Sequence, residues 1–441
     1  MFGRGSEINF SIATSLLNPL NDRRICMRRR DFIKVAGAAA VGAMTNLSLP
    51  AILTAAPSKK PEIKIGALFS SSGAMANIEG RLTHICRMAA EEINAKGGVL
   101  GRMVKTIGVD PASDWPLYAQ LGRQLLLQEK VAAIFGCWTS VSRQSVLPVI
   151  EQNNGLLFYP LHFEGEENSK NVVYMNSPPS SSLLPAVDYL MSPDGGNAKR
   201  FYMLGSDYVW PRTMNKILKG YLKTKSIDEK SWREQYVPFG FSNFQSIVND
   251  IRKFASEPGG QPIVSFTVVG NSIPAFFKEI INQGIKSTDI PVLGLDVLEV
   301  DLEGLNTKPL VGHLNDWAYL QAANNPINKK FLANWKSYVQ KHKLPYKADV
   351  MSDPMCSAYD AVHMWAKATE KAGTTDVNAV RAALPGITFD SPCGYKIKLT
   401  NKNNYVWRGV FIGSINDHQS FDILWQSKDT PEPIPYSPYA S

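Results

Sequence analysis

The sequence has few cysteines, and their spacing argues against two classes of protein. Its 441 residues contain five cysteines, and those after the N-terminal segment form no CxxC pair: Cys86, Cys137, Cys356 and Cys393. This pattern argues against a structural zinc site and against a fold held together by many disulfides, so we expect buried free thiols. The six histidines also lack the spacing of metal ligands, and we therefore expect no metal and no cofactor.

The chain also lacks long apolar runs and a strong charge of one sign. After the N-terminal segment, no apolar run reaches about 18 residues, the length that a membrane-spanning helix needs. Of the 47 Lys+Arg and 39 Asp+Glu, seven and three lie in residues 1–56, which leaves 40 basic and 36 acidic residues. This balance argues against nucleic acid as a partner. The length favours two domains or one large α/β unit.

The first 56 residues have the order of an export signal. A basic stretch at 28–34 precedes a small-residue apolar run at 35–44, which continues weakly to Ala56. Arg29 and Arg30, followed by Asp-Phe-Ile-Lys, resemble the twin-arginine signal that directs folded proteins across the bacterial inner membrane. The alternative is the basic start of a buried, alanine-rich helix. We predict a twin-arginine signal peptide over 1–56, with the true start at Met1 or Met27, the twin-arginine machinery as a partner and a periplasmic location.

From residue 61 onward, strand and helix patterns alternate. Buried-strand patterns lie at 63–69, 103–109, 131–135, 156–159, 200–204, 263–269 and 291–295. Amphipathic-helix patterns lie between them at 78–96, 117–128, 141–152, 212–223, 243–255 and 273–283. Alternation of this kind predicts an α/β fold with parallel sheets and right-handed crossovers.

The two blocks of alternating elements predict two lobes. We assign 61–178 and 312–390 to lobe 1, and 179–311 and 391–427 to lobe 2. The segment 313–321 is expected to be a returning strand, and 352–372 a helix that packs in the core or between the lobes. The tail, 428–441, is Pro-rich and expected to be irregular.

The turns that follow the strands are the candidate ligand site. In open α/β sheets, ligands bind beyond the carboxyl ends of the strands. These turns are rich in hydroxyls, amides and aromatic rings and carry no row of charges: 70–73, 136–140, 159–163, 205–211 and 270–272. Such a lining suits a small, neutral, polar molecule.

Three stretches resemble one family. They read Phe-Gly-Cys-Trp-Thr-Ser-Val-Ser-Arg at 135–143, Asn-Gly-Leu-Leu-Phe-Tyr-Pro at 154–160 and Gly-Ser-Asp-Tyr-Val-Trp-Pro-Arg-Thr at 205–213. They are similar to the urea and short-chain-amide binding proteins, which are branched-chain amino-acid type solute-binding proteins of ABC transporters. The amide receptors that regulate amidase expression are close cousins. The resemblance implies a type I periplasmic binding protein with two Rossmann-like lobes joined by a three-crossing hinge, and an inner-membrane ABC permease as partner.

The resemblance also implies ligand positions. The residues that match family ligand positions are Trp138, Ser140, Tyr159, Leu161, Tyr208 and Trp210. Thr139, Gly270 and Asp296 are further candidate ligand-binding residues, because they lie at strand ends. The chain departs from the family pattern at 161–163, where it reads Leu-His-Phe, at 177–182 and at 296–299. His162 is therefore either a ligand contact, a pH-sensing group or a plain loop residue. Asp207 and Asp296 either accept an N–H of the ligand or cap a helix.

These features predict an exported protein that captures urea or a related short-chain amide and delivers it to an ABC permease. An amide sensor that regulates a partner protein is the alternative. An amide hydrolase is a third possibility, with Cys137 as nucleophile. The Glu and Lys that such enzymes pair with their cysteine are not visible in the sequence, so we expect no enzyme.

Overall fold

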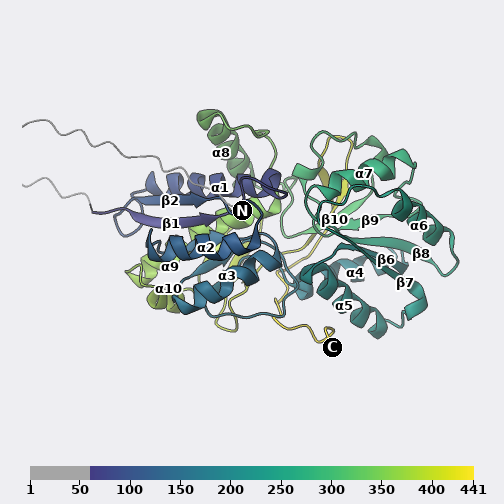
Figure 1. Cartoon of the computed structure of the whole chain (residues 1–441), viewed down its shortest axis with the longest axis horizontal. Coiled ribbons are helices and arrows are strands. Elements are labelled where there is room, and N and C mark those ends of the chain that lie inside the picture. The colour runs from purple at the N-terminus through teal and green to yellow at the C-terminus, as the bar shows by residue number, and fades with distance from the viewer. Residues whose placement is uncertain (1–59) are drawn as a thin grey trace, which may run out of the picture. The chain divides into compact units, whose positions relative to one another are not determined.

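The first lobe is built on a five-stranded parallel sheet. The computed structural model describes residues 60–441, and the predicted signal peptide lies outside the described residues (Figure 1). The sheet has the order β2-β1-β3-β4-β5, with β1 at Ile63–Leu68, β2 at Val104–Val109, β3 at Ile134–Gly136, β4 at Leu157–Tyr159 and β5 at Val172–Tyr174. All four neighbouring pairs are parallel.

Among the described residues, six helices belong to this lobe, and four of them pack in two pairs. The helices are α1 at Ala76–Asn94, α2 at Trp115–Leu127, α3 at Ser140–Gln152, α8 at Pro326–His342, α9 at Asp353–Ala372 and α10 at Val377–Ala383. Helix α1 lies beside α9, and α2 lies beside α3 (Figure 1). Helix α9 is buried along most of its length, because small residues such as Ala358 and Ala361 let it approach the sheet closely.

The second lobe is built on a seven-stranded mixed sheet. Its order is β15-β14-β10-β9-β8-β6-β7. The strands are β6 at Ala198–Ser206, β7 at Trp232–Val237, β8 at Gln261–Thr267, β9 at Val292–Gly294, β10 at Leu314–Trp317, β14 at Phe411–Ile415 and β15 at Phe421–Gln426. Strands β6 to β10 are parallel, and β14 and β15 add an antiparallel edge. Its helices are α4 at Leu183–Met191, α5 at Val209–Thr224, α6 at Gln245–Ser256 and α7 at Ser272–Asn282.

A small antiparallel sheet completes the structure beside the first lobe. It joins β11 at Thr388–Asp390, β12 at Lys396–Leu399 and β13 at Val406–Trp407. Tyr405 bridges to Tyr174 of β5, and their rings stack with centroids 4.4 Å apart. Among residues 60–441, every helix is too short or too polar to cross a bilayer.

The α/β fold with two lobes is confirmed, but two expected boundaries move. Strand β10 was expected in lobe 1 and lies in the second sheet, because it pairs with β9 on one side and β14 on the other. Residues 391–427 were assigned to lobe 2, yet β12 and β13 belong to the small sheet and only β14 and β15 join the second one. The chain passes between the lobes at 175–182, 318–325 and 408–410.

The crossings are held together by a buried ion pair. Arg408, in the third crossing, donates from Nη1 to Asp360 Oδ2 on α9 at 2.8 Å and to Met175 O in the first crossing at 3.4 Å. Both side chains of the pair are 0% exposed. Ser391 Oγ also donates to Asp360 Oδ2, at 2.7 Å. The pair therefore ties α9 to two of the three crossings.

Candidate functional site

A small cavity lies between the strand ends of the two lobes. The first lobe contributes Trp138, Ser140, Tyr159, Leu161 and His162, and the second contributes Tyr208, Trp210 and Asp296. Its volume is only about 10 Å³, far below the roughly 300–1,000 Å³ of pockets for drug-sized ligands and close to the room that one water molecule needs. A space this small excludes large solutes, and a solute of a few heavy atoms would enter it only with a slight outward movement of its walls.

The turn after β3 places Trp138 and Ser140 at the cavity. A side chain at Gly136 would meet Leu68 Cβ at 2.7 Å, so only glycine lets β3 end this close to β1. The Tyr159 hydroxyl donates to Trp138 O at 2.6 Å and joins the turns after β3 and β4. Thr139 accepts from Ser142 N at 3.1 Å and caps α3 instead of lining the cavity.

A buried ion network lies directly behind Ser140. Its Oγ donates to Glu164 Oε2 at 2.5 Å and is 3.3 Å from Arg143 Nη1. Arg143 is fully buried, donates to Glu167 Oε1 at 3.0 Å, and lies over the rings of Tyr159 and Phe163 at 4.7 and 4.4 Å. Burial raises the pKa of Glu164, and Arg143 opposes that shift. Because the Ser140 hydrogen is already donated, Ser140 can only accept from a ligand.

Two polar atoms of the second lobe can still form a hydrogen bond with a ligand. Trp210 Nε1 and Asp296 Oδ2 are both buried, and neither finds a hydrogen-bond partner within residues 60–441. Burial raises the pKa of Asp296 well above its usual value. A buried donor and a buried acceptor without partners are costly unless something binds them. The cavity wall therefore favours an occupant that has both an acceptor and an N–H donor.

Seven of the nine predicted site residues line this cavity; Thr139 and Gly270 do not. Gly270 lies at a positive φ of 64°, where an added Cβ would meet Met75 Cε at 2.9 Å, so it serves a close contact between the lobes. Asp207 is half-exposed and pairs with Arg212 at 2.7 Å, so it is neither a cap nor a cavity residue.

The structure adds two residues to the site. His162, whose role the sequence left open, lines the cavity, and Trp317 stacks on its ring at 4.1 Å. The departure from the family pattern at 161–163 pointed toward His162. No local signal pointed to Trp317, which lies 155 positions away in the sequence.

The cysteines and potential metal ligands among residues 60–441 add no reactive group to the site. The four cysteines among residues 60–441 are buried free thiols, and burial raises the pKa of Cys137, so it stays protonated. Within the same residues, no group of three His, Cys, Asp or Glu side chains is placed to hold a metal ion.

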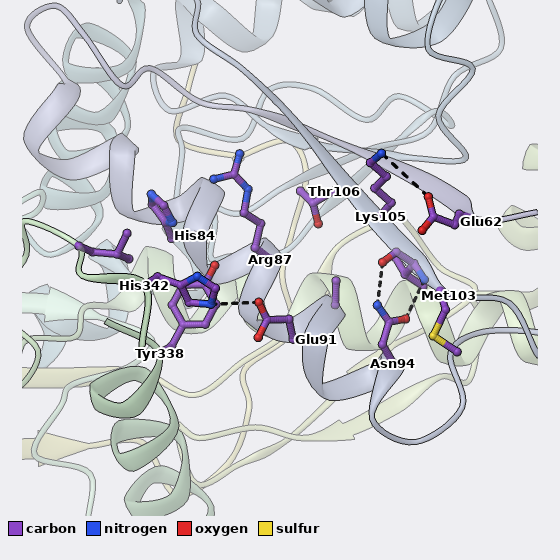
Figure 2. A pocket seen from close by; sticks show the side chains of 13 residues that line it. Glu62, His84, Arg87, Glu91, Asn94, Met103, Lys105, Thr106, Tyr338 and His342 are labelled. Carbon is purple, nitrogen blue, oxygen red and sulfur yellow. Dashed lines mark hydrogen bonds and ion pairs between the residues drawn. The ribbon is translucent and has the colours of Figure 1, made fainter. Parts of the chain in front are cut away.

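A larger depression lies on the first lobe alone, between α1, β2 and α8 (Figure 2). Its volume is about 650 Å³. Figure 2 shows two pairs among its charged side chains: His342 lies 3.2 Å from Glu91, and Lys105 lies 4.0 Å from Glu62. Because every lining residue belongs to one lobe, an occupant there would not bridge the lobes. The interlobe cavity is therefore the better candidate.

A family model described as a periplasmic binding protein domain matches residues 63–441. The chain belongs to this periplasmic binding protein family. The family match implies a periplasmic location and a solute-binding role. The relatives described below are named as binding proteins.

Relatives of this periplasmic binding protein are distant but match over most of their length. It is 23% identical over 385 residues to Leu/Ile/Val-binding protein homolog 7 of Brucella melitensis, covering 83% of this chain and 92% of the relative. A solute binding protein of an ABC transporter from Rhodopseudomonas palustris, solved with p-hydroxybenzoic acid, aligns with a TM-score of 0.72 and 20% identity over 84% of this chain and 98% of that one. A leucine binding protein from Thermotoga maritima gives 0.66 and 19% over 82% and 98%. At these identities the solved structures show a common fold.

Proposed function

We propose that this periplasmic binding protein captures urea or a related short-chain amide in the interlobe cavity and delivers it to an ABC permease in the inner membrane. The observation that carries the proposal is the set of hydrogen-bond donors and acceptors that line the cavity. It has the acceptors Ser140 Oγ and Asp296 Oδ2, the donor Trp210 Nε1, and aromatic walls. Urea and primary amides combine N–H donors and one carbonyl acceptor in a few heavy atoms.

The cavity lining contains no Lys or Arg side chain that could pair with the carboxylate of an amino acid or an aromatic acid. None of the eight lining residues is Lys or Arg, and Arg143, behind Ser140, already pairs with Glu164 and Glu167. A carboxylate buried without a partner costs several kcal/mol. Asp296 adds a further obstacle, because an ionised Asp296 would repel the carboxylate and a protonated one could donate only one hydrogen bond. The ligands named for the leucine and p-hydroxybenzoate relatives therefore fit this lining poorly.

We expect residues 57–441 to bind urea or acetamide and to bind leucine and p-hydroxybenzoate far more weakly. Isothermal calorimetry on all four compounds checks this. Trp210→Phe keeps an aromatic wall and removes the free N–H, and it should weaken amide binding by about 1–2 kcal/mol, roughly 5- to 30-fold. The same change at Trp232, on β7 outside the cavity, is the matched control. Leucine as the tightest ligand would refute the proposed ligand class.

We also propose that the protein reaches the periplasm through the twin-arginine pathway. Replacing Arg29 and Arg30 by lysine should leave the precursor in the cytoplasm, because the export receptor recognises the guanidinium pair. Expressed from Met1, the chain carries its own control, since Arg23 and Arg24 form a second arginine pair upstream. Lysine at 23 and 24 should leave export unchanged. Immunoblots of cell fractions decide the matter, and equal periplasmic yield from both variants would exclude this route.

A further inference from the structure

One side chain of the first lobe inserts between two tryptophan rings of the second lobe. His162 follows β4, and its ring stacks on Trp317 with centroids 4.1 Å apart and planes 2° apart, and on Trp210 at 5.1 Å and 19°. Trp317 is fixed in turn, because its Nε1 donates to Val297 O at 2.8 Å. His162 therefore fills an aromatic slot whose two walls belong to the opposite lobe.

A carboxyl group from the second lobe also faces His162. Asp296 Oδ1 lies 3.6 Å from His162 Nε2, and the two side chains are only 3% and 10% exposed. The other oxygen, Asp296 Oδ2, is the acceptor without a partner that was described at the cavity. The contact joins the two lobes beside the ligand position, so it exists only while the cleft is closed.

We propose that His162 is a positioning residue for ligand capture, and that His162 and Asp296 together hold one proton in the closed form, so that closure is linked to pH. This inference rests on the proposed function, since it assumes that the cleft closes on a solute. The slot positions the first lobe against the second, and His162 acts on the ligand through Asp296.

The groups around the pair decide where its proton lies. Burial lowers the pKa of His162 to about 4, although the carboxyl groups of Asp353 on α9 and Glu164 act in the opposite direction. Burial raises the pKa of Asp296 well above its usual value. These directions leave His162 neutral and the proton on Asp296 in the closed form. We place that proton on Oδ1, which faces His162 Nε2, so that Oδ2 keeps its capacity to accept a hydrogen bond.

Two further titratable groups lie on elements packed here. Asp316, on the same strand as Trp317, has its pKa raised to about 8 by burial and by Asp353. Tyr208, on the turn before α5, has its pKa raised well above its usual value by burial and by Asp296. Tyr208 therefore stays neutral through the physiological range. Asp316 is the competing source of a pH effect and serves below as a control.

The sign of the pH effect follows from the open form. We take both side chains to face water there, with the ordinary pKa values of about 6.5 for His162 and about 3.9 for Asp296. Between about pH 4 and 6.5 the open pair already holds one proton, so closure takes up none. Above about pH 6.5 the open pair holds none, and closure must take up one proton. The dissociation constant is then expected to rise up to about tenfold per pH unit.

Three variants give distinct profiles of dissociation constant against pH, measured with urea or acetamide from pH 5 to 8.5. Asp296→Asn leaves only His162 to titrate, so binding should weaken below about pH 6.5 and stay constant above it. His162→Phe keeps the stacked ring without its proton, so binding should weaken with rising pH across the whole range. Asp316→Asn should keep the profile of the unmodified protein. A flat profile for the unmodified protein, or one that only Asp316→Asn abolishes, would overturn the inference.

A ligand-free measurement separates this inference from the proposed function. A fluorophore pair on cysteines introduced at the exposed positions Gln128 and Ser256 reports the separation of the lobes by energy transfer. We expect the closed fraction to fall above about pH 6.5, and His162→Phe to move this midpoint toward lower pH. If urea and amides fail to bind while closure still follows pH, the ligand proposal is wrong and the proton link holds. If amides bind while closure and affinity ignore pH, the proton link is wrong and the ligand proposal holds.

Discussion

Replacing Arg143 by methionine should lower the free energy of unfolding by about 3–5 kcal/mol. The guanidinium is 0% exposed, and its partners Glu164 and Glu167 are 2% and 14% exposed. Removing the cation leaves two acidic groups buried beside each other without compensation, which costs more than the ion pairs themselves contribute. Guanidinium chloride denaturation followed by circular dichroism measures the effect and avoids urea, the proposed ligand.

Arg212→Met is the matched control for this prediction. Arg212 pairs with Asp207 at 2.7 Å, but the two side chains are 55% and 50% exposed. Water screens that pair, so its loss should leave the unfolding free energy close to that of the unmodified protein. If the two variants lose equal stability, Arg143 is not the centre of a buried network.

Arg408→Met should destabilise the protein by a similar amount, about 3–5 kcal/mol, through the crossings. The variant leaves the carboxylate of Asp360 buried beside α9 and removes the donor to Met175 O. Adding Asp360→Asn should restore most of the lost stability, because the double variant buries no charge and Asn can still accept from Ser391. Thermal unfolding of both variants tests this. A double variant less stable than Arg408→Met alone would show that the carboxylate does not depend on Arg408.

The sequence predicted the elements with strong local patterns and missed those without one. The helix expected at 352–372 is observed at Asp353–Ala372, and the strand expected at 200–204 is the centre of β6. Strand β7 was missed because it is a polar edge strand with one buried residue, Val237. Helix α8 was missed although Asn325 and Pro326 form a recognisable start, at which Asn325 caps Asn328 N at 2.9 Å.

For the site, too, features encoded by neighbouring residues could be predicted, and contacts between distant residues could not. The strand-end turns and the family resemblance located seven of the eight cavity residues, because each turn can be identified from its own strand. The seat of His162 could not be predicted, since its walls come from residues 210 and 317. The Arg143 network was equally hidden, because Glu164 and Glu167 lie 21 and 24 positions further along the chain. Neither the stacking of His162 nor the ion pairs of Arg143 produce a recognisable pattern in the sequence.

The order of strands in the second sheet sets a time at which the protein can finish folding. Strand β14 lies between β10 and β15, so β10 remains an open sheet edge until residues 411–426 have been synthesised. The first lobe waits almost as long, because α9 and the Tyr405 bridge to β5 come from the last quarter of the chain. Neither lobe can therefore complete its core before these late segments have left the ribosome.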